Sequence, residues 1–409
     1  MKKINYQPFG ELLKRVVDNR GKTCPTSDRG IPLIATNCIL NTQLYPQHLK
    51  VRFVDDVTYK NWFRGHPDPG DMIFVTKGSP GRVAWVPDPV GFCIAQDMVA
   101  ITADESKVYP KYLFAALRSK SIQYEIQGLH VGTLIPHFKK GDFNDLYIPI
   151  PNSEDQLRIG NMYFDLSLKI DLLHRQNKTL EAMAETLFRQ WFVEEAKEDW
   201  EEVSLGEIAV IQNGFSFKSS SYVEQEEEHL EVFKMGHIEP GGGLRYSPKR
   251  NFVPRTERLL KWVLTKDDIV MAMTDMKDSM GILGHPAMID QSNKYVLNQR
   301  VARIYLKDDA VLINNHFLYL QMCTDEAISI IQSKAHGGVQ VNLSTETIRS
   351  TPVLVPPLNI QEDKWLLIEP LMQKQSHNRE SIFTLENLRD TLLPKLMSGE
   401  VRVKMNEQS

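Results

Sequence analysis

The sequence has little of what several classes of protein need. Its 409 residues include four cysteines, Cys24, Cys38, Cys93 and Cys323, which lie far apart and form no CxxC pair. This spacing argues against a zinc site or a disulfide framework and predicts small buried side chains. No apolar run approaches the roughly 18 to 20 residues of a membrane span, and the first residues lack a signal peptide's apolar core. The sequence therefore predicts a cytoplasmic protein with no membrane partner.

An excess of positive charge is also absent. The chain has 48 Lys and Arg against 52 Asp and Glu, a net charge of −4. This balance excludes a protein held on nucleic acid by bulk charge alone. Residues 1–150 contain 19 basic and 14 acidic residues, whereas residues 198–355 contain 16 basic and 22 acidic ones. Any binding of nucleic acid must therefore depend on local clusters.

Catalytic motifs are missing as well. Gly21-Lys22-Thr23 matches the tail of a phosphate-binding loop, but Val16 stands where the first glycine should be. Pro356-Pro357 lacks the preceding Asn or Asp and the following aromatic residue that an amino-methyltransferase needs. No two histidines have the i, i+4 spacing of a metal pair. We therefore expect a non-enzymatic chain without a metal or cofactor of its own.

What the sequence does contain is an internal repeat with a period near 205 residues. Gln156 returns as Gln361 at this offset, and several segments return in the same order. Five ordered matches predict two copies of one unit. The matching segments are 9–12 with 205–208, 95–101 with 298–304, 132–138 with 337–343, 148–151 with 353–356, and 178–187 with 383–392.

Each copy combines about 150 residues of mixed pattern with a helical run. Segments 71–75 and 268–271 are rich in apolar residues and are bounded by Gly, Pro or Asp, as strands are. Segments 112–117 and 316–322 have a helical pattern. The sequence therefore predicts two α/β (α+β) domains, at residues 1–150 and 199–355.

Long helices are expected after each domain, at residues 151–198 and at 356–409 together with a C-terminal tail. From Glu154 to about residue 196, apolar residues alternate by four and three, the spacing of a coiled-coil seam. We expect Pro370 to kink or restart the second helix and Pro394 to end it. An antiparallel pair is favoured because two half-apolar helices can bury each other, the alternative being that each packs on its own domain. Residues expected to pair the helices or dock other subunits are Leu166, Ile170, Leu173, Leu180, Leu187, Ile382, Leu385 and Leu392.

Two divergent domains, each followed by a Pro-rich edge and a long helix, resemble the specificity subunit of type I restriction-modification systems. The resemblance is strongest in segments 337–343, 353–361 and 391–401, and segment 70–82 looks like the family's strand and glycine loop. Segment 151–156 departs from the family pattern. The resemblance implies two target-recognition domains that each read half of a bipartite site on double-stranded DNA. It also implies that the helices space the domains and dock two modification (methyltransferase) subunits.

The resemblance further implies that catalysis belongs to partner chains, including restriction subunits in the full complex. S-adenosylmethionine, ATP and Mg are expected in those partners and no cofactor in this chain. Two alternatives remain open from the residues themselves. The chain could be a protein-only scaffold without DNA contact, or a bilobal hydrolase that uses carboxylates such as Asp71 and Asp268.

Candidate DNA contacts gather first at a glycine loop of each domain. In segment 77–82, two glycines allow close backbone approach, while Lys77, Ser79 and Arg82 supply donors. We expect Arg82 to read a base, although the segment could also be an ordinary hairpin turn. The corresponding segment 274–279 differs in charge and offers Thr274 and Lys277.

A basic stretch and two further glycine loops complete the candidates. Segment 245–261 has six basic residues against one acid and interleaved aromatic rings, so it can contact phosphates, although it could equally be a solvated loop. Gln340, beside Gly337, can pair with adenine, although a loop amide that is satisfied within the protein is the favoured alternative. The candidates here are Arg245, Tyr246, Lys249, Arg250, Arg255, Gly132, Thr133, Gly337 and Gln340. Half-sites on one face of B-DNA lie about 34 to 36 Å apart, so we expect two specified blocks around an unspecified spacer.

Overall fold

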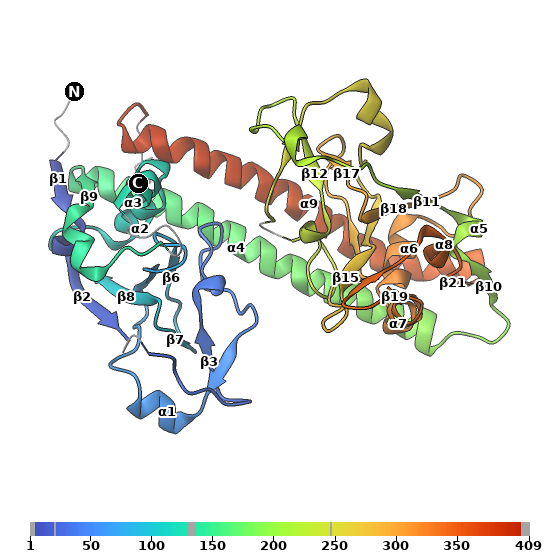
Figure 1. Ribbon diagram of the computed structural model, residues 1–409, viewed down its shortest axis with the longest axis horizontal. Coiled ribbons are helices and arrows are strands. Elements are labelled where there is room, and N and C mark those ends of the chain that lie inside the picture. Colours follow the sequence, from blue (N-terminus) through green and yellow to red (C-terminus); the bar gives the residue numbers. More distant parts are fainter. Residues whose placement is uncertain (1–4, 20–21, 130–135, 246–247, 402–409) are drawn as a thin grey trace, which may run out of the picture. The chain divides into compact units, whose positions relative to one another are not determined.

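The computed structural model describes residues 5–19, 22–129, 136–245 and 248–401 (Figure 1). The chain divides into two compact units. Unit 1 comprises Met1–Arg175 and Glu380–Ser409, and unit 2 comprises Gln176–Arg379. Each unit therefore holds one mixed domain together with one part of each of two long helices.

The domain of unit 1 has a four-stranded sheet in the order β2-β8-β5-β6, a three-stranded sheet β4-β3-β7 and the pair β1-β9. Among the described residues of this domain, three α-helices accompany the sheets. The strands are β1 (Asn5–Pro8), β2 (Leu13–Asp18), β3 (Ile31–Ile34), β4 (Arg52–Val54), β5 (Met72–Val75), β6 (Val83–Trp85), β7 (Cys93–Ile94), β8 (Met98–Ala103) and β9 (Tyr147–Ile150). The helices are α1 (Asp56–Asn61), α2 (Pro110–Arg118) and α3 (Lys120–Leu129).

The domain of unit 2 has the corresponding sheets β11-β18-β14-β16 and β13-β12-β17, the pair β10-β21, and an added sheet β15-β20-β19. Its strands are β10 (Glu201–Ser204), β11 (Ala209–Asn213), β12 (Leu230–Phe233), β13 (Phe252–Val253), β14 (Ile269–Ala272), β15 (Thr274–Met276), β16 (Pro286–Met288), β17 (Tyr295–Leu297), β18 (Val301–Leu306), β19 (His336–Gly337), β20 (Gln340–Asn342) and β21 (Pro352–Val355). Its helices are α5 (Leu205–Ile208), α6 (Asn315–Met322), α7 (Asp325–Ser333) and α8 (Thr345–Arg349).

The two domains repeat each other strand for strand, which confirms the fold expected from the internal repeat. In both four-stranded sheets all neighbours are antiparallel. In both three-stranded sheets one pair is parallel, β3 with β7 and β12 with β17. Fully buried strands such as β5 and β14 explain why their sequences are apolar without alternation, since both faces are covered.

The long helices are α4 (Ser153–Arg189), which continues into a π-helical turn at Gln190–Glu194, and α9 (Leu358–Met397). In unit 2, Asn378 donates from Nδ2 to Gln176 Oε1 at 2.7 Å and to Asn177 Oδ1 at 2.9 Å. Further along the same unit, Lys364 lies over the ring of Trp191. Residue numbers rise along one helix as they fall along the other, so the pair is antiparallel, as expected.

In each unit, the parts of α4 and α9 that belong to it also pack on the domain of that unit. In unit 2, Phe188 of α4 and Trp365 of α9 belong to the same buried cluster as Phe317 of α6. In unit 1, Tyr163 and Leu393 belong to the cluster that contains Phe114 of α2. The two packing alternatives left open by the sequence therefore both hold. Of the expected seam residues, Ile170, Leu173 and Ile382 are buried, whereas Leu166, Leu180, Leu187, Leu385 and Leu392 are partly buried.

Helix α9 neither restarts at Pro370 nor ends at Pro394, contrary to the expectation from the sequence. The helix runs through Pro370 and passes Pro394 before it ends at Met397. Each proline removes one hydrogen bond, to the carbonyl four residues earlier. Pro370 and Leu366 are both exposed, as are Pro394 and Asp390, so water can reach this face of the helix. The stop comes from Gly399, whose φ of +75° and N–H bond to the Leu396 carbonyl form a C-terminal cap.

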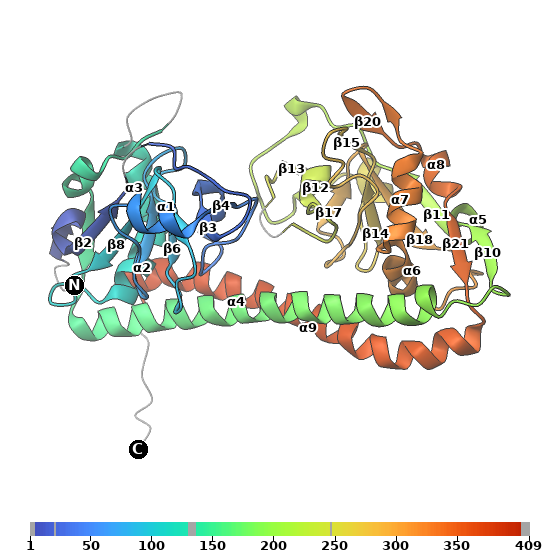
Figure 2. The same cartoon turned by 90° about the horizontal axis from the view of Figure 1, so that it is seen from below.

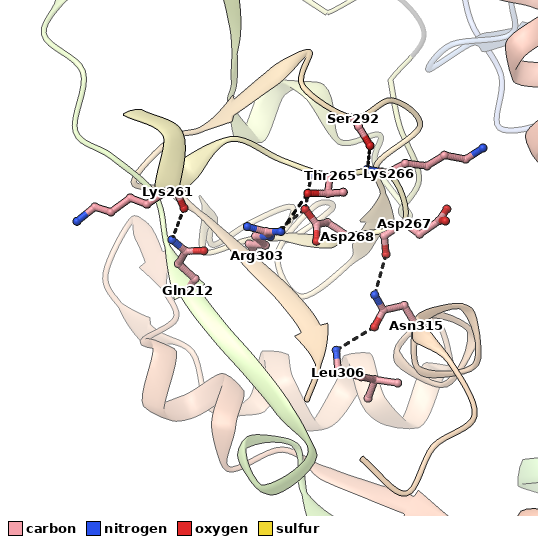
Figure 3. A network of polar contacts seen from close by, with 10 residues as sticks. All are labelled: Gln212, Lys261, Thr265, Lys266, Asp267, Asp268, Ser292, Arg303, Leu306 and Asn315. Atoms are coloured by element: carbon pink, nitrogen blue, oxygen red, sulfur yellow. Dashed lines mark hydrogen bonds and ion pairs between the residues drawn. The ribbon is translucent and has the colours of Figure 1, made fainter. Parts of the chain in front are cut away.

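The polar residues that could suggest a hydrolase have structural partners. Asp71 pairs with Arg15 at 2.8 Å and accepts from Thr102 at 2.6 Å. The corresponding Asp268 pairs with Arg303 at 2.8 Å and accepts from the backbone N–H of Thr265 at 2.6 Å (Figure 3). Burial is the largest influence on Asp268 and raises its pKa. Both carboxylates anchor the turn before a central strand, which argues against the hydrolase alternative.

Cysteine burial follows the expectation only in part. Cys24, Cys38 and Cys93 are buried free thiols, and Cys323 is partly exposed. Burial raises the pKa of the Cys93 thiol to about 12. Within the described ranges no helix is long and apolar enough to cross a membrane, and no cluster of three or more potential metal ligands occurs.

Candidate nucleic-acid interface

The candidate DNA contacts are positioned by one edge of each four-stranded sheet. In unit 1, β2 and β5 end where β8 and β6 begin, because Asp18 pairs with Val99, Val75 with Met98 and Phe74 with Val83. In unit 2, the ends of β11 and β14 meet the starts of β18 and β16 in the same way. We call this edge of each sheet the loop edge.

In unit 1, the segment between β5 and β6 forms the centre of the loop edge. Gly78 and Gly81 have φ values of +83° and +92°, which favour glycine. Gly78 N–H donates to the Pro136 carbonyl at 2.9 Å, and Phe138 N–H donates to the Thr76 carbonyl at 2.9 Å. The loop is therefore a hairpin connection held by a neighbouring segment, and its contact with DNA stays a prediction.

Two cations of this loop have no polar side-chain partner in the part of the chain that the structure describes. Among the described residues, neither Lys77 nor Arg82 makes a side-chain hydrogen bond or ion pair, and each is partly exposed, as is Ser79. Lys139 and Lys140 follow the paired segment 136–138 and are exposed. These two lysines were not among the candidates expected from the sequence, although their position after the glycine-rich repeat segment could have indicated them. Gly132 and Thr133 lie outside the described residues.

In unit 2 the loop edge carries an added sheet that brings four candidates together. β15 pairs with β20 so that Thr274 faces Asn342 and Met276 faces Gln340. Lys277 N–H donates to the Val339 carbonyl at 3.0 Å. Lys277 and Gln340 are exposed, and the sheet lies on the side of the domain away from α4 and α9 (Figure 2).

The other two candidates of this sheet have local roles. Thr274 is buried, and its hydroxyl donates to Asn342 Oδ1 at 3.0 Å. Gly337 has a φ of +144°, and a Cβ there would lie 2.1 Å from the Gln340 carbonyl oxygen. The tight β19–β20 hairpin therefore requires glycine. Both residues shape the surface on which Lys277 and Gln340 stand.

Three cations of the basic stretch are tied to their own domain. Arg245 lies 3.5 Å from Glu239, Arg250 lies 3.6 Å from Glu231, and Arg255 donates to Asn293 at 3.2 Å. Lys249 is exposed. Tyr246 lies outside the described residues. The geometry favours a stabilising role for the paired arginines, and their contact with DNA stays a prediction.

The partner of Arg250 belongs to a buried polar cluster. Glu231 of β12 is 3% exposed, and His237 Nε2 lies 3.0 Å from its Oε1. Burial alone would raise the pKa of Glu231. The hydrogen bond with His237 and the charges of Arg250 and Lys294 outweigh burial and hold the pKa below its ordinary value. The cluster therefore keeps an ionised carboxylate under the basic stretch.

A ring cluster beside the loop edge of unit 2 was not expected. The ring centroids of Phe217 and Trp262 lie 4.9 and 4.8 Å from that of Phe215. Arg258 lies over Phe215, and Lys261 lies over Trp262. Gly214 makes the close turn possible, because a Cβ there would lie 2.2 Å from the Asn298 carbonyl oxygen. The pattern Gly-Phe-Ser-Phe was the available signal in the sequence.

Comparison with known proteins decides the family. The family described as type I restriction modification DNA specificity domain matches residues 18–182 and 197–386. The chain belongs to this family. Its two matches coincide with the two structural repeats, so each copy of the repeat is a DNA specificity domain.

Curated relatives agree with this assignment. The type I restriction enzyme MjaIX specificity subunit of Methanocaldococcus jannaschii is 24% identical over 356 residues, which cover 77% of this chain and 76% of the relative. The MjaVIII specificity subunit of the same organism is 26% identical over 334 residues, covering 76% and 75%. The crystal structure of the type I restriction-modification S subunit from M. genitalium shares the fold, with a TM-score of 0.54, 18% identity and coverage of 99% and 98%.

Membership of the family defines the role of the chain in general terms. It is a non-catalytic specificity subunit that recognises DNA sequence in a type I restriction-modification system. Which side chains contact DNA is a separate question, and the loop edges offer the candidates.

Proposed function

We propose that each domain reads one half of a bipartite site on double-stranded DNA through its loop edge. In this proposal the functional segments are residues 1–150 and 199–355 for recognition and 151–198 and 356–409 for spacing. The observation that carries the proposal is the strand-for-strand repeat with different side chains on the same edge. Lys77 and Arg82 stand there in unit 1, and Lys277 and Gln340 stand there in unit 2.

This arrangement suits recognition of two different sequences by one scaffold. The sheets fix the loop backbones, so exchange of side chains at the edge alters the donors and acceptors offered to base edges. Exposed lysines such as Lys139 and Lys140 would contact phosphates and set the orientation of the duplex. The target would then contain two specified blocks and an unspecified spacer.

The proposal also assigns partners. The antiparallel pair of α4 and α9 would dock two modification subunits, and restriction subunits would join the full complex. S-adenosylmethionine, ATP and Mg would be bound by those chains. Because the substrate is the DNA of the cell and the methyltransferase must act on it, the complex would work in the cytoplasm.

One experiment tests the proposal against a protein-only scaffold. The full chain is coexpressed with its modification subunit, methylated adenines are mapped across the host genome, and duplex binding is measured at increasing salt. We expect one bipartite motif and a steep loss of affinity with salt, because phosphate contacts release counterions. An assembled complex that neither binds duplex nor methylates a bipartite motif would support the scaffold instead.

A further inference from the structure

One position of the loop edge carries opposite charges in the two domains. Asp97 stands immediately before β8 in unit 1, and Arg300 stands immediately before β18 in unit 2. The two positions correspond because β8 and β18 occupy the same place in their sheets. A residue at this position is next to the segment that contains Lys77 in one domain and next to Met273 in the other.

The backbone at this position is held in the same way in both domains. The Asp97 carbonyl accepts from the Thr76 and Lys77 N–H groups at 3.0 and 3.3 Å, and the Arg300 carbonyl accepts from Met273 N–H at 2.9 Å. Two residues earlier, Ala95 donates to the Ile34 carbonyl at 2.9 Å and Asn298 to the Phe233 carbonyl at 3.1 Å. The backbone is therefore held alike in the two domains, while the side chain at this position is negatively charged in unit 1 and positively charged in unit 2.

In the described parts of the two domains, neither charged side chain has a polar partner. Among the residues that the structure describes, the Asp97 carboxylate and the Arg300 guanidinium have no hydrogen bond or ion pair. Asp71 and Arg303, in contrast, form ion pairs that lie toward the opposite end of the same sheets. Arg300 is exposed. Asp97 lines a pocket of about 280 Å³ with Thr36, Arg52 and Gln96.

The chemistry of DNA gives each charge a specific ligand. A carboxylate near a duplex is repelled by phosphates, so it is useful only where it accepts a hydrogen bond from a base. In the major groove, cytosine presents its N4 amino group without an adjacent acceptor on the same base, whereas adenine places N7 beside its amino group. Guanine presents O6 and N7, which match the two donors of a guanidinium.

We propose that Asp97 and Arg300 are corresponding base-reading residues of the two domains. Asp97 accepts from the amino group of a cytosine in the half-site of the first domain. Arg300 donates to a guanine in the half-site of the second. This inference rests on the proposed function, because it needs both loop edges to face the major groove.

The test uses the full chain with its modification subunit and maps methylated motifs for Asp97→Asn and Arg300→Gln. Each variant should relax one G·C position in one half-site, where discrimination should fall about 5- to 150-fold, the equivalent of the roughly 1 to 3 kcal/mol of a good contact to a base. Matched controls are Glu105→Gln and Arg349→Gln. Glu105 is exposed beyond the other end of β8, and Arg349 is exposed beside Gly206 of α5, which precedes β11. Both controls should leave the motif unchanged.

Several outcomes separate this inference from the proposed function. An unchanged motif in both variants, or relaxation spread over both half-sites, overturns the assignment of Asp97 and Arg300. The proposed function still stands in that case if the wild-type complex methylates a bipartite motif. If a variant methylates too weakly to map, its complex is titrated with duplexes substituted at each position. Loss of discrimination at a single G·C pair then supports the assignment, and an unaltered preference contradicts it. Failure of the wild-type complex to bind duplex removes both.

Discussion

At the residue scale, the basic residues of the two domains fall into those that pair with carboxylates of the protein and those at the loop edges that are available to a ligand. Arg15 and Arg303 neutralise buried carboxylates, and Arg250 lies beside Glu231. Among the described residues, Lys77 and Arg82 make no such pair. A DNA phosphate or base would be their first strong partner, so binding need not break an existing ion pair.

We expect different effects from two substitutions on the same loop. Arg82→Ala should lower discrimination at one base pair by about 1 to 3 kcal/mol, because a base contact is lost. Lys77→Ala should weaken binding to all duplexes and reduce the salt slope by about 1, because a phosphate contact is lost. Fluorescence anisotropy with cognate and substituted duplexes at several salt concentrations measures both. Lys14→Ala is the control, since Lys14 is exposed at the opposite end of β2, and an equal effect there would contradict the assignment.

The buried Glu231 cluster predicts a pH dependence of stability. The folded-state pKa of Glu231 is lowered, so its ionised form stabilises the domain above the unfolded pKa of about 4.3, and this contribution is lost as the pH falls through the folded pKa. Glu231→Gln should cost about 1 to 3 kcal/mol at pH 7. The difference from wild type should shrink as the pH falls below about 4.

Urea unfolding at pH 7 and near pH 3.5 measures this difference. Glu226→Gln is the matched control, because Glu226 is exposed and its contact with His229 lies on the surface. A stability deficit of Glu231→Gln that stays constant between the two pH values would show that lost packing, not lost charge, is responsible.

The residue scale also shows how far sequence reasoning can reach. The motif around Gly78 and Gly81 indicated the loop correctly, because glycine is the residue that most readily adopts the positive φ values found there. The sequence could not show that Arg250 pairs within its own domain. Its partner Glu231 is 19 positions away, and only the pairing of β12 with β13 brings the two residues together. Asp97 and Arg300 were aligned by the repeat, but that their side chains have no polar partner among the described residues is visible only in the structure.

At the element scale, two glutamines join the long helices to their domains. Gln361 of α9 is fully buried; its Oε1 accepts from Ile313 N–H at 3.0 Å, and its Nε2 donates to the carbonyls of Val311 and Pro356 at 3.1 and 2.8 Å. Gln156 of α4 makes the equivalent bonds with Tyr109 and Pro151. The two glutamines, which are 205 residues apart, therefore have the same role in the two copies of the repeat. Each lies near the start of its long helix and hydrogen-bonds a backbone group of the loop before α2 or α6.

Removal of the unit 2 glutamine should be costly. Gln361→Leu has a similar volume but leaves the Ile313 N–H and two carbonyls unpaired in a buried site, so the free energy of unfolding should fall by about 2 to 4 kcal/mol. Gln373→Leu is the control, because Gln373 is exposed on the same helix. Chemical denaturation measures both variants. Equal stability of the two would mean that water replaces the glutamine without loss.

The helices also show where pattern reasoning fails. The seam of four and three predicted the pair, and Asn177 with Asn378 supplies a buried polar contact within it. The expected restart at Pro370 and the expected end at Pro394 were wrong, because a proline on an exposed helix face costs one hydrogen bond that water can replace. Exposure of a helix face depends on tertiary packing, so the sequence could not decide the outcome.

At the scale of the whole molecule, each domain is closed at its base by its own ends. β1 pairs with β9 and β10 pairs with β21, both antiparallel, so the chain enters and leaves each domain at neighbouring points. The two large cores are also separate, one within each compact unit. A domain inserted in this way can change its loops without altering the connection to α4 and α9.

This separation predicts that the two half-sites are exchanged independently. We expect a chain whose residues 201–355 are replaced by the corresponding domain of a relative with another target to keep its first half-site and acquire the relative's second one. The spacer should stay unchanged, because α4 and α9 are retained. Mapping of methylated motifs with the original modification subunit checks all three expectations.

The exchange must keep the packing of Phe188, Trp365 and Ile368 on the new domain. Donor domains with apolar residues at the positions that contact these three side chains are therefore preferred. A change in the first half-site would show that the domains do not read independently, and a change in the spacer would show that the exchanged domain, not the helix pair, sets the separation.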